Sequence, residues 1–510
     1  MAVKIIFLVV FFAIMVLVGI QSRKHATNVN DFVLGGRKVG PWLTAFAFGT
    51  SYFSSVVFVG YAGQFGWRYG IASTWIGLGN AFIGSLLAWV ILGRRTRVMT
   101  NHLSASTMPE FFGKRYESNA LKIVSSIIIF VFMVPYTASI YNGLSRLFGM
   151  AFDIPYEVCV IVMAVLTGVY VILGGYMATA INDFIQGIIM LAGIAAVILS
   201  VLNGQGGFTQ ALSKLASDPT MTGAAIDNTT PGIYTSFFGP DVLGLFSVVI
   251  LTSLGTWGLP QMVHKFYAIK DEKSIRTGTV VSTVFALVVA GGSYFLGGFG
   301  RLFRDESFLT ESGVQYDGII PFMLSTLPDI LIGIVIVLVL SASMSTLSSL
   351  VLTSSTTLTL DFIKGTFAKN MSERRQLLIL RVLIGFFIIL SVVLALNPPT
   401  FIAQLMGISW GAMAGAFLAP FMLGLYWKGV TRASVWACFF TGVGITVANM
   451  FFNFFSNSIV AGAAAMLIGL VVVPVVSLVT PRLKKEQLEH CFECYDTAIR
   501  KKETEKIVQE

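Results

Sequence analysis

Two runs of small hydroxyl residues lie inside long apolar stretches of the chain, at residues 50–55 and 341–349. Hydroxyl and carbonyl oxygens are hard ligands, which suit a small hard cation such as Na⁺ and not a soft metal. Gly49, beside the first run, also allows a membrane helix to unwind and turn its carbonyls inward. The two runs therefore predict a cation site. The alternatives are close helix packing through small residues and hydroxyls that bond back to their own helix.

Asp183 is the only acidic residue in the apolar stretch 158–213. A carboxylate inside a membrane span costs a few kcal/mol on insertion scales. A bound cation is the simplest compensation, which makes Asp183 a further candidate ligand. The alternative is that Asp183 lies at the inner mouth, at the turn between two spans, where water solvates it.

Glycine and proline interrupt one further apolar span, at residues 252–261. Paired interrupted helices in the two halves of a transporter point to its binding site. Here the interrupted helices open two runs of five predicted spans, 42–203 and 242–427. A unit with an odd number of spans that is repeated once must be inverted, and this is the geometry of alternating-access symporters.

The composition places these elements in a membrane. The chain has 510 residues, of which 55% are hydrophobic and 12% charged, whereas a soluble protein carries about 25% charged residues. The mean hydropathy of +0.81 points the same way. A soluble globular enzyme, a disordered protein and a nucleic-acid binder are therefore excluded. Charge-free runs predict thirteen spans, with the longest runs divided near 397–399 and 453–457.

The positive charges predict the orientation of the chain. With the N-terminus outside and the C-terminus in the cytoplasm, 28 Lys and Arg residues fall inside and 6 fall outside, as the positive-inside rule requires. This scheme assigns Lys265 to an inner loop. The long outer connections 204–240 and 301–317 are either lids or plain surface segments. Residues 104–116 are expected to form a short interfacial element.

The C-terminal tail, residues 482–510, is charged and is expected to form a loose cytoplasmic helix. It contains His490, Cys491 and Cys494. A Cys-x-x-Cys pair beside a histidine can bind zinc or form a redox pair, but it supplies at most three metal ligands. Incidental cysteines on a short helix are the simpler interpretation.

Five motifs follow one another along the chain: DFVLGGR at 31–37, GGYMA at 174–178, DFIQ at 183–186, WGLPQ at 257–261 and ASMSTLS at 342–348. With these motifs the chain resembles the sodium:solute symporter family, which includes proline, pantothenate, sialic acid and sodium/glucose transporters. The order and spacing fit along about 30–480. The chain looks most similar to bacterial pantothenate- and proline-permease-like members.

The resemblance implies an all-α integral membrane protein with a LeuT-like core of two inverted five-helix repeats. One extra helix precedes this core and two follow it, which agrees with the thirteen predicted spans. The implied units are the extra N-terminal helix with the first inner loop (1–30), the first repeat (31–203), an extracellular loop (204–240), the second repeat (241–428), two C-terminal helices (429–481) and the cytoplasmic tail (482–510).

The resemblance also implies where sodium binds. In the family, the site lies where the first core helix is broken and crosses the eighth. The implied ligands are the carbonyls of Thr50, Phe53 and Ala342 and the hydroxyls of Ser345 and Thr346. Some members bind a second sodium ion with the fifth-helix acid and hydroxyls further along the eighth helix. The matching residues here are Asp183, Ser345, Ser348 and Ser349.

Solute contacts in the family come from the first, third, sixth and tenth core helices. The resemblance carries them to Ser54, Ser55, Val56, Tyr136, Thr252, Thr256, Trp257, Ser409 and Trp410. Proline transporters carry an Asp at the position of Tyr52 and aromatic residues at the positions of Thr252 and Thr256. Sugar transporters carry a polar pair at 56–57. This chain departs from both patterns and looks more like the pantothenate permeases around Tyr52. No Lys or Arg is expected in the solute pocket, so helix N-termini at the breaks would face a single carboxylate.

The expected function is import of a small monocarboxylate or amino acid, coupled to Na⁺, by alternating access. Membrane lipids, Na⁺ and the solute are the expected partners, a monomer suffices, no nucleic acid takes part, and the location is a bacterial plasma membrane. Uptake of pantothenate or proline specifically is a narrower alternative. A proton-coupled transporter that titrates Asp183 and a non-transporting sensor of the same fold are the others. An intramembrane enzyme is disfavoured, because no histidine of the chain pairs in sequence with a membrane acid or cysteine.

Overall fold

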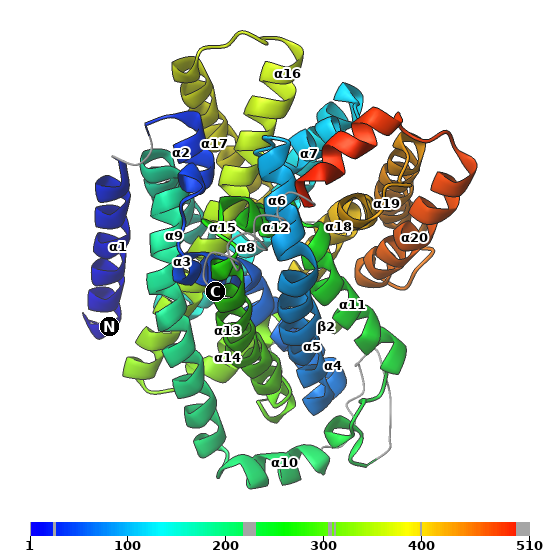
Figure 1. Ribbon diagram of the computed structural model, residues 1–510. Helices are drawn as coiled ribbons and strands as arrows, with labels where there is room; N and C mark the ends of the chain where they lie inside the picture. The colour runs from blue at the N-terminus through cyan, green and yellow to red at the C-terminus, as the bar shows by residue number, and fades with distance from the viewer. Residues whose placement is uncertain are drawn as a thin grey trace, which may run out of the picture.

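The computed structural model describes residues 2–23, 27–152, 154–217, 231–303, 309–310, 313–397 and 400–495. These residues form a bundle of helices with one short antiparallel pair of strands, β1 (Leu309–Thr310) and β2 (Gly313–Val314) (Figure 1). The all-α membrane architecture predicted from the sequence is confirmed.

The N-terminal half of the chain runs from a peripheral helix into the first set of core helices. Its elements are α1 (Ala2–Ser22), α2 (Val29–Leu34), α3 (Pro41–Tyr52), α4 (Ala62–Tyr69), α5 (Thr74–Gly79), α6 (Arg94–His102), α7 (Met108–Arg115), α8 (Asn119–Phe152), α9 (Tyr156–Gly204) and α10 (Phe208–Ala216). Wider π-helical turns at Val56–Tyr61, Asn80–Leu87 and Trp89–Gly93 connect several of these helices.

The second set of core helices and the C-terminal pair follow. Their elements are α11 (Val242–Gly258), α12 (Pro260–Ala268), α13 (Lys273–Gly297), α14 (Ile319–Ser325), α15 (Asp329–Thr356), α16 (Lys364–Thr366), α17 (Glu373–Leu396), α18 (Ile402–Tyr426), α19 (Arg432–Phe452) and α20 (Ser458–Val479). A π-helical turn at Thr357–Ile363 joins α15 to α16.

Both predicted helix interruptions are present. α3 ends at Tyr52, Phe53 is extended (φ −109°, ψ 129°), and helix resumes after Ser54. α11 ends at Gly258, and Pro260 opens α12 at an angle of 44°. Proline fits this position because it lacks the N–H that a continuing helix would need and because its φ suits a first turn.

A third interruption divides α9 at Gly175, whose φ of +56° is left-handed. Glycine adopts this conformation without the steric cost that a Cβ imposes. Phe32 of α2 packs directly beside Gly175, so a Cβ there would also collide with the Phe32 carbonyl. The single element α9 therefore contains two helical segments that meet next to α2.

In the part of the chain that the structure describes, ten helices are long and apolar enough to cross a membrane, or eleven when the bent pair α11–α12 is counted as one. The predicted count of thirteen stays a prediction. The counts differ where long helical stretches are interrupted. Val56–His102 is one apolar helical stretch of 47 residues, and the backbone changes direction within it at Gly70, whose φ is +60°. α9 likewise contains the break at Gly175.

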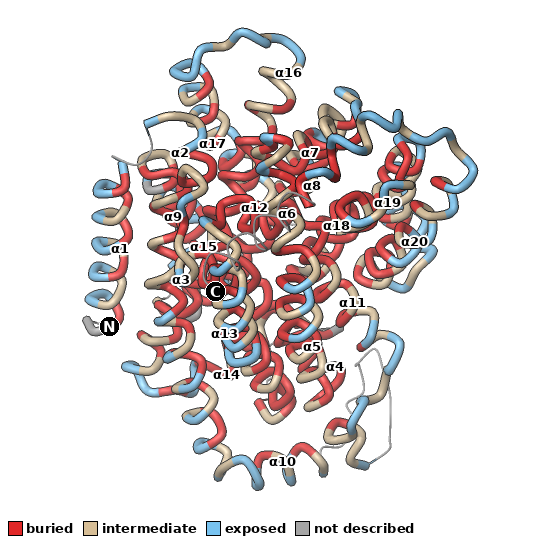
Figure 2. Tube along the Cα trace, in the orientation of Figure 1, coloured by how far each residue is buried: buried red, intermediate tan, exposed pale blue. Residues whose placement is uncertain are grey.

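α15 lies at the centre of the bundle. Of its most apolar 18 residues 83% are buried, against 22% in α1 and 28% in α17 (Figure 2). α15 packs against α3, α8 and α9. α1 lies at the rim, where it contacts α9 and α15. The hydroxyl-rich run 341–349 on α15 is therefore shielded from lipid, and its partners come from the protein itself.

The tail is packed and not loose over its described part. Residues 485–495 are helical, and Cys491, Cys494 and Tyr495 are buried. Burial raises the pKa of the Cys494 thiol to about 12, so this thiol stays protonated at neutral pH and is a poor nucleophile and metal ligand. His490 faces Glu493 and His102 of α6 instead. The cysteines thus serve packing.

Asp317 gives a pH-dependent test of this fold. It is buried in the turn Tyr316–Gly318, where it accepts a hydrogen bond from the Ile402 N–H (3.4 Å) and faces Arg146 and Tyr156. Burial raises the pKa of Asp317 from 3.8 to about 6. The folded state therefore favours the protonated acid, and this contribution is complete below pH 3.8 and lost as the pH rises through about 6.

Asp317→Asn keeps an acceptor that cannot ionise. Its melting temperature relative to the wild type should rise between about pH 4 and 6 and level off above, with a stability gain on the order of 2–3 kcal/mol. Thermal unfolding of both proteins across this pH range measures the difference. A difference that does not change with pH would contradict a buried, titrating Asp317.

Candidate sodium and solute site

The break in α3 and the middle of α15 meet at the side chain of Thr346. The Thr346 hydroxyl oxygen lies 3.1 Å from the Phe53 carbonyl, 3.2 Å from the Ala342 carbonyl and 3.4 Å from the Thr50 carbonyl. The Ser51 carbonyl is 3.5 Å away. Four backbone carbonyls from two helices thus converge on one point in the buried centre of the bundle.

This convergence follows from the local sequence. α3 ends at Tyr52, so the regular hydrogen bonds of the helix stop there, and the Thr50 carbonyl accepts from the Phe53 N–H (3.2 Å) at the helix end. On α15 the Ala342 carbonyl accepts from Thr346 four residues later. The Thr346 hydroxyl has one proton, so it can donate to only one of these carbonyls at a time. A hard cation, by contrast, accepts several oxygen ligands at once.

Four of the five predicted sodium ligands come together here: the Thr346 hydroxyl and the carbonyls of Thr50, Phe53 and Ala342. Ser345, the fifth, directs its hydroxyl to the Thr50 hydroxyl (2.7 Å), which in turn donates to the Phe46 carbonyl (2.8 Å). Ser345 therefore lies beside the carbonyl cluster but bonds to a neighbouring side chain. The same hydroxyl also faces the Asp183 carboxylate, so it lies between the carbonyl cluster and this acid.

A buried ion pair lies next to this cluster. The Lys265 ammonium of α12 donates to the Ser349 hydroxyl (2.9 Å) and lies 3.7 Å from the Asp183 carboxylate of α9. The side chains of Lys265 and Asp183 are 2% and 0% exposed. Of the hydroxyls predicted for a second ion, Ser349 thus faces the lysine, while Ser348 bonds to the Ser345 carbonyl of its own helix (2.9 Å).

Sequence reasoning missed Lys265 because it counted this residue among the charges of an inner loop. The structure corrects this assignment: α12 extends from Pro260 to Ala268, and all nine of its residues are buried. Asp183 is likewise buried and paired, so water at the inner mouth does not solvate it. The one available signal was the short spacing between Pro260 and Lys265. A helix that starts at this proline, inside the bundle, keeps the lysine within the protein interior.

The predicted solute residues divide into two groups. In the first, the rings of Tyr52, Tyr136 and Trp410 meet, with centroids 6.3 Å apart for Tyr52–Trp410 and 5.9 Å for Tyr136–Trp410. The Tyr52 hydroxyl donates to the Thr252 carbonyl (2.7 Å), and the Thr252 hydroxyl donates to Asn80 Oδ1 (2.8 Å). This aromatic and amide cluster, which joins both helix breaks, is the candidate solute site. Neither Tyr52 nor Asn80 was predicted to line it.

The second group bonds elsewhere. Each of these polar groups already has a backbone partner: Thr256 donates to the Gly84 carbonyl (3.0 Å), Trp257 to the Ile83 carbonyl (3.0 Å), Ser409 to the Leu405 carbonyl (3.0 Å) and Ser55 to the Ile140 carbonyl (2.9 Å), and Ser54 accepts from the N–H of Val56 (3.2 Å). The bonds of Thr256, Trp257 and Ser55 join neighbouring segments, whereas those of Ser54 and Ser409 stay within their own segment. A solute would have to displace these bonds to reach the five residues.

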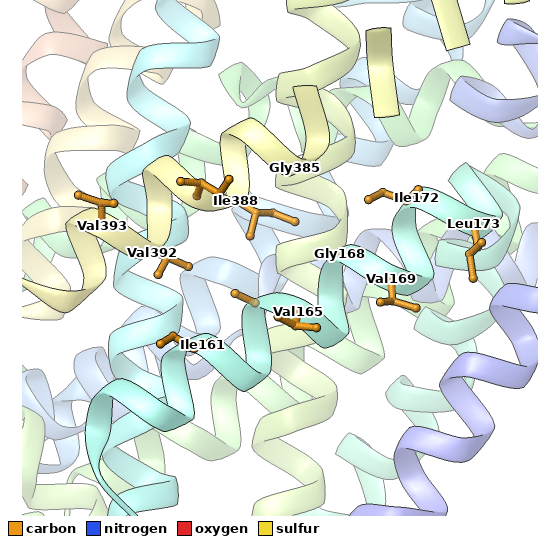
Figure 3. A pocket seen from close by; sticks show the side chains of 12 residues that line it. Ile161, Val165, Gly168, Val169, Ile172, Leu173, Gly385, Ile388, Val392 and Val393 are labelled. Carbon is orange, nitrogen blue, oxygen red and sulfur yellow. The ribbon is translucent and has the colours of Figure 1, made fainter. Parts of the chain in front are cut away.

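A large apolar cavity of about 560 Å³ lies elsewhere, between α9 and α17 (Figure 3). Its lining includes Ile161, Val165, Gly168, Ile388 and Val392, and none of the described side chains that line it is charged or carries a hydroxyl. Val165 is 59% exposed on the outer surface of the bundle, so the cavity opens toward lipid. It has none of the polar groups that would orient a small organic solute.

Comparison with known proteins gives the family of this chain. The family model of the sodium:solute symporter family matches residues 32–442. The chain belongs to the sodium:solute symporter family. Curated relatives include the osmoregulated proline transporter OpuE of Bacillus subtilis, 29% identical over 86% of this chain and 87% of the relative. A sodium/proline symporter of Staphylococcus aureus (strain JH9) is 30% identical over 84% and 82%.

Solved structures support the fold. A Na⁺-coupled sialic acid symporter, captured in a substrate-bound outward-open state, superposes with a TM-score of 0.76 at 17% identity, over 94% of this chain and 98% of that chain. MhsT in complex with L-phenylalanine gives a TM-score of 0.53 at 15% identity, over 86% and 97%. The predicted LeuT-like core is confirmed. This family member is therefore a multi-pass membrane transporter that couples a solute to Na⁺ and is not an enzyme.

Proposed function

We propose that this symporter binds Na⁺ at the carbonyl cluster around Thr346 and imports a small monocarboxylate or amino acid bound at the cluster of Tyr52, Tyr136 and Trp410. The observation that carries the proposal is the convergence of the Thr50, Phe53 and Ala342 carbonyls on one hydroxyl. The Ser345 hydroxyl, one side chain away, would complete the five oxygens.

Coupling of sodium to solute follows because consecutive residues of the α3 break belong to the two clusters. The Phe53 carbonyl faces the sodium site, and Tyr52, the preceding residue, directs its ring and hydroxyl into the solute site. A sodium ion that orders the break also orders Tyr52, so each ligand raises the affinity of the protein for the other, by the same factor. The membrane potential adds about 2.3 kcal/mol per 100 mV for each positive charge carried inward.

Cavities of similar volume lie at the two ends of the bundle. At one end, the Arg37 guanidinium binds the carbonyls of Tyr267 (3.1 Å) and Ala105 (2.6 Å), Val39 pairs with Ile269, and Lys122 and Asp361 line a cavity of about 550 Å³. At the other end, a cavity of about 610 Å³ lies along α4. With the N-terminus outside and the C-terminus in the cytoplasm, the Arg37 end is the cytoplasmic one.

The solute class rests on the lining of the candidate site. Three aromatic rings and the Asn80 amide suit a small, partly apolar solute with one polar group to be oriented. The helices that resume after the two breaks begin at Val56 and Pro260, and the N–H groups of such N-termini can face one carboxylate. Because relatives are named proline transporters, proline is the first amino acid to test, and pantothenate the first larger acid.

The test is thermal unfolding of the purified protein in NaCl or choline chloride, with proline, other amino acids, pantothenate, small monocarboxylates and sugars. A ligand that binds only the folded state raises its melting temperature. We expect one solute class to stabilise the protein in Na⁺ and not in choline. If Na⁺ has no effect with or without any solute, the sodium site is wrong and proton coupling moves to the front. If only sugars stabilise, the solute class is wrong.

A further inference from the structure

A lysine side chain lies where a second sodium ion would bind. The ammonium of Lys265 is held by the Ser349 hydroxyl at 2.9 Å, the Asp183 carboxylate at 3.7 Å and the face of the Tyr176 ring at 5.3 Å. A carboxylate and hydroxyls are also what a second sodium ion would use. We propose that Lys265 is a built-in cation that fills this site, so that the symporter binds one Na⁺ per cycle.

Electrostatics disfavours a lysine and a sodium ion together at this place. Asp183 supplies one negative charge, which the Lys265 ammonium balances inside a fully buried region. A sodium ion on the same carboxylate would lie about 4 Å from the ammonium. At an effective dielectric constant near 20, repulsion at this distance weakens binding about a thousand-fold. The pair therefore excludes the second ion as long as the lysine is charged.

The lysine also connects to the first sodium site. Ser349, which binds the ammonium, shares a hydrogen bond with the Ser51 hydroxyl (2.9 Å), and the Ser51 carbonyl is one of the four that converge on Thr346. The ammonium thus reaches the broken end of α3 through two hydroxyls. In this role Lys265 is a positioning residue: it orders the α3 break from α12 without leaving the protein. The inference rests on the proposed sodium site and adds the number of ions.

The experiment uses Na⁺ alone as the ligand. The melting temperature of the purified full-length chain is titrated with NaCl, with choline chloride replacing it to hold ionic strength constant. Well above the dissociation constant, stabilisation rises with log[Na⁺] at a slope proportional to the number of ions bound by the folded state. We expect the slope of one ion for the wild type. A wild-type slope of two ions would overturn the inference and leave the proposed function standing.

Lys265→Met removes the charge and keeps most of the side-chain volume. It frees Asp183 to bind an ion, so we expect a slope about twice that of the wild type and a protein that needs Na⁺ to stay folded. Adding Asp183→Asn to Lys265→Met removes the site and should return the slope to one ion. Lys270→Met, which neutralises an exposed lysine just beyond α12, is the matched control and should behave as the wild type.

Two further outcomes separate the explanations. If Lys265→Met folds with an unchanged slope, or fails to fold at saturating Na⁺ while the double variant folds, no sodium ion replaces the lysine and the inference is wrong. If the wild type shows no Na⁺ slope at all, the first sodium site fails, and the proposed function fails with it. Lys265→Arg keeps the charge and should keep the single-ion slope.

Discussion

Thr346→Ala is expected to abolish most of the sodium dependence of this symporter. The Thr346 hydroxyl is the point on which the carbonyls of Thr50, Phe53 and Ala342 converge, at 3.4, 3.1 and 3.2 Å. Removing a ligand that meets a charged group costs about 1.5–3 kcal/mol, so the concentration of Na⁺ needed for half-maximal effect should rise about 10- to 100-fold. Sodium titration of solute uptake in proteoliposomes, with melting temperature in parallel, measures this shift.

Two variants make this result specific. Thr346→Ser keeps the hydroxyl and should restore sodium affinity to within a few-fold of the wild type. Thr359→Ala removes an equally buried hydroxyl that bonds to the Ser355 carbonyl of its own helix (2.7 Å), just beyond α15, and should leave the sodium titration unchanged. If Thr346→Ala titrates as the wild type does, the carbonyl cluster is a packing contact and sodium binds elsewhere.

The cluster of carbonyls and hydroxyls around Thr346, where we propose that sodium binds, could be predicted because its chemistry is local in the sequence. Exposing a hydroxyl side chain to lipid costs free energy, and small residues gain little there, so a run of both inside an apolar span indicates a buried contact. Residues 50–55 and 341–349 both follow this rule, and the structure brings them together across nearly 300 positions, as the Ser345–Thr50 hydrogen bond shows. What the pattern could not supply is the rotamer of Ser345, which depends on the Thr50 side chain opposite.

Lys265 shows where sequence reasoning failed and why. Positive charge at the edge of an apolar run is normally cytoplasmic, and the rule treats every such lysine alike. Depth in the membrane, however, is set by where the helix starts. α12 begins at Pro260 in the middle of the bundle, and the Asp183 carboxylate of α9 compensates the buried ammonium. Only the packing of α12 against its neighbours could reveal this ion pair.

The prediction of the solute-binding residues was incomplete for a related reason. Thr256 and Trp257 were predicted from their type and from the interrupted span, but both bond to carbonyls of the segment around Gly84. Asn80 was not predicted, although its amide oxygen accepts from Thr252. In a tightly packed bundle a polar side chain is as often a link between helices as a ligand for solute. The direction of the side chain decides which of the two roles it has, and the position of a residue in a helix does not by itself give this direction.

Gly66→Ala is expected to prevent the bundle from assembling. Gly66 of α4 lies directly against the backbone of Gly297 at the end of α13, and a Cβ would collide with the Gly297 carbonyl group and lie 2.8 Å from its Cα. Backbone cannot yield as a flexible side chain can, so α4 and α13 must separate. Overpacking of this kind costs about 1–3 kcal/mol or more. We expect little monodisperse protein after purification, and a much lower melting temperature for whatever remains.

Gly385→Ala is the matched control, because Gly385 also lies within a helix, α17, and a Cβ there meets no atom within 4 Å. Its yield and melting temperature should equal or exceed those of the wild type, since alanine is the better helix former. Two glycines of the same chemistry then give opposite results, and only their neighbours differ. α4 follows the break at which we propose that sodium binds, and α13 packs against α3 as well as α4. A stable Gly66→Ala protein with normal sodium affinity would show that this close approach is not what fixes the broken helix.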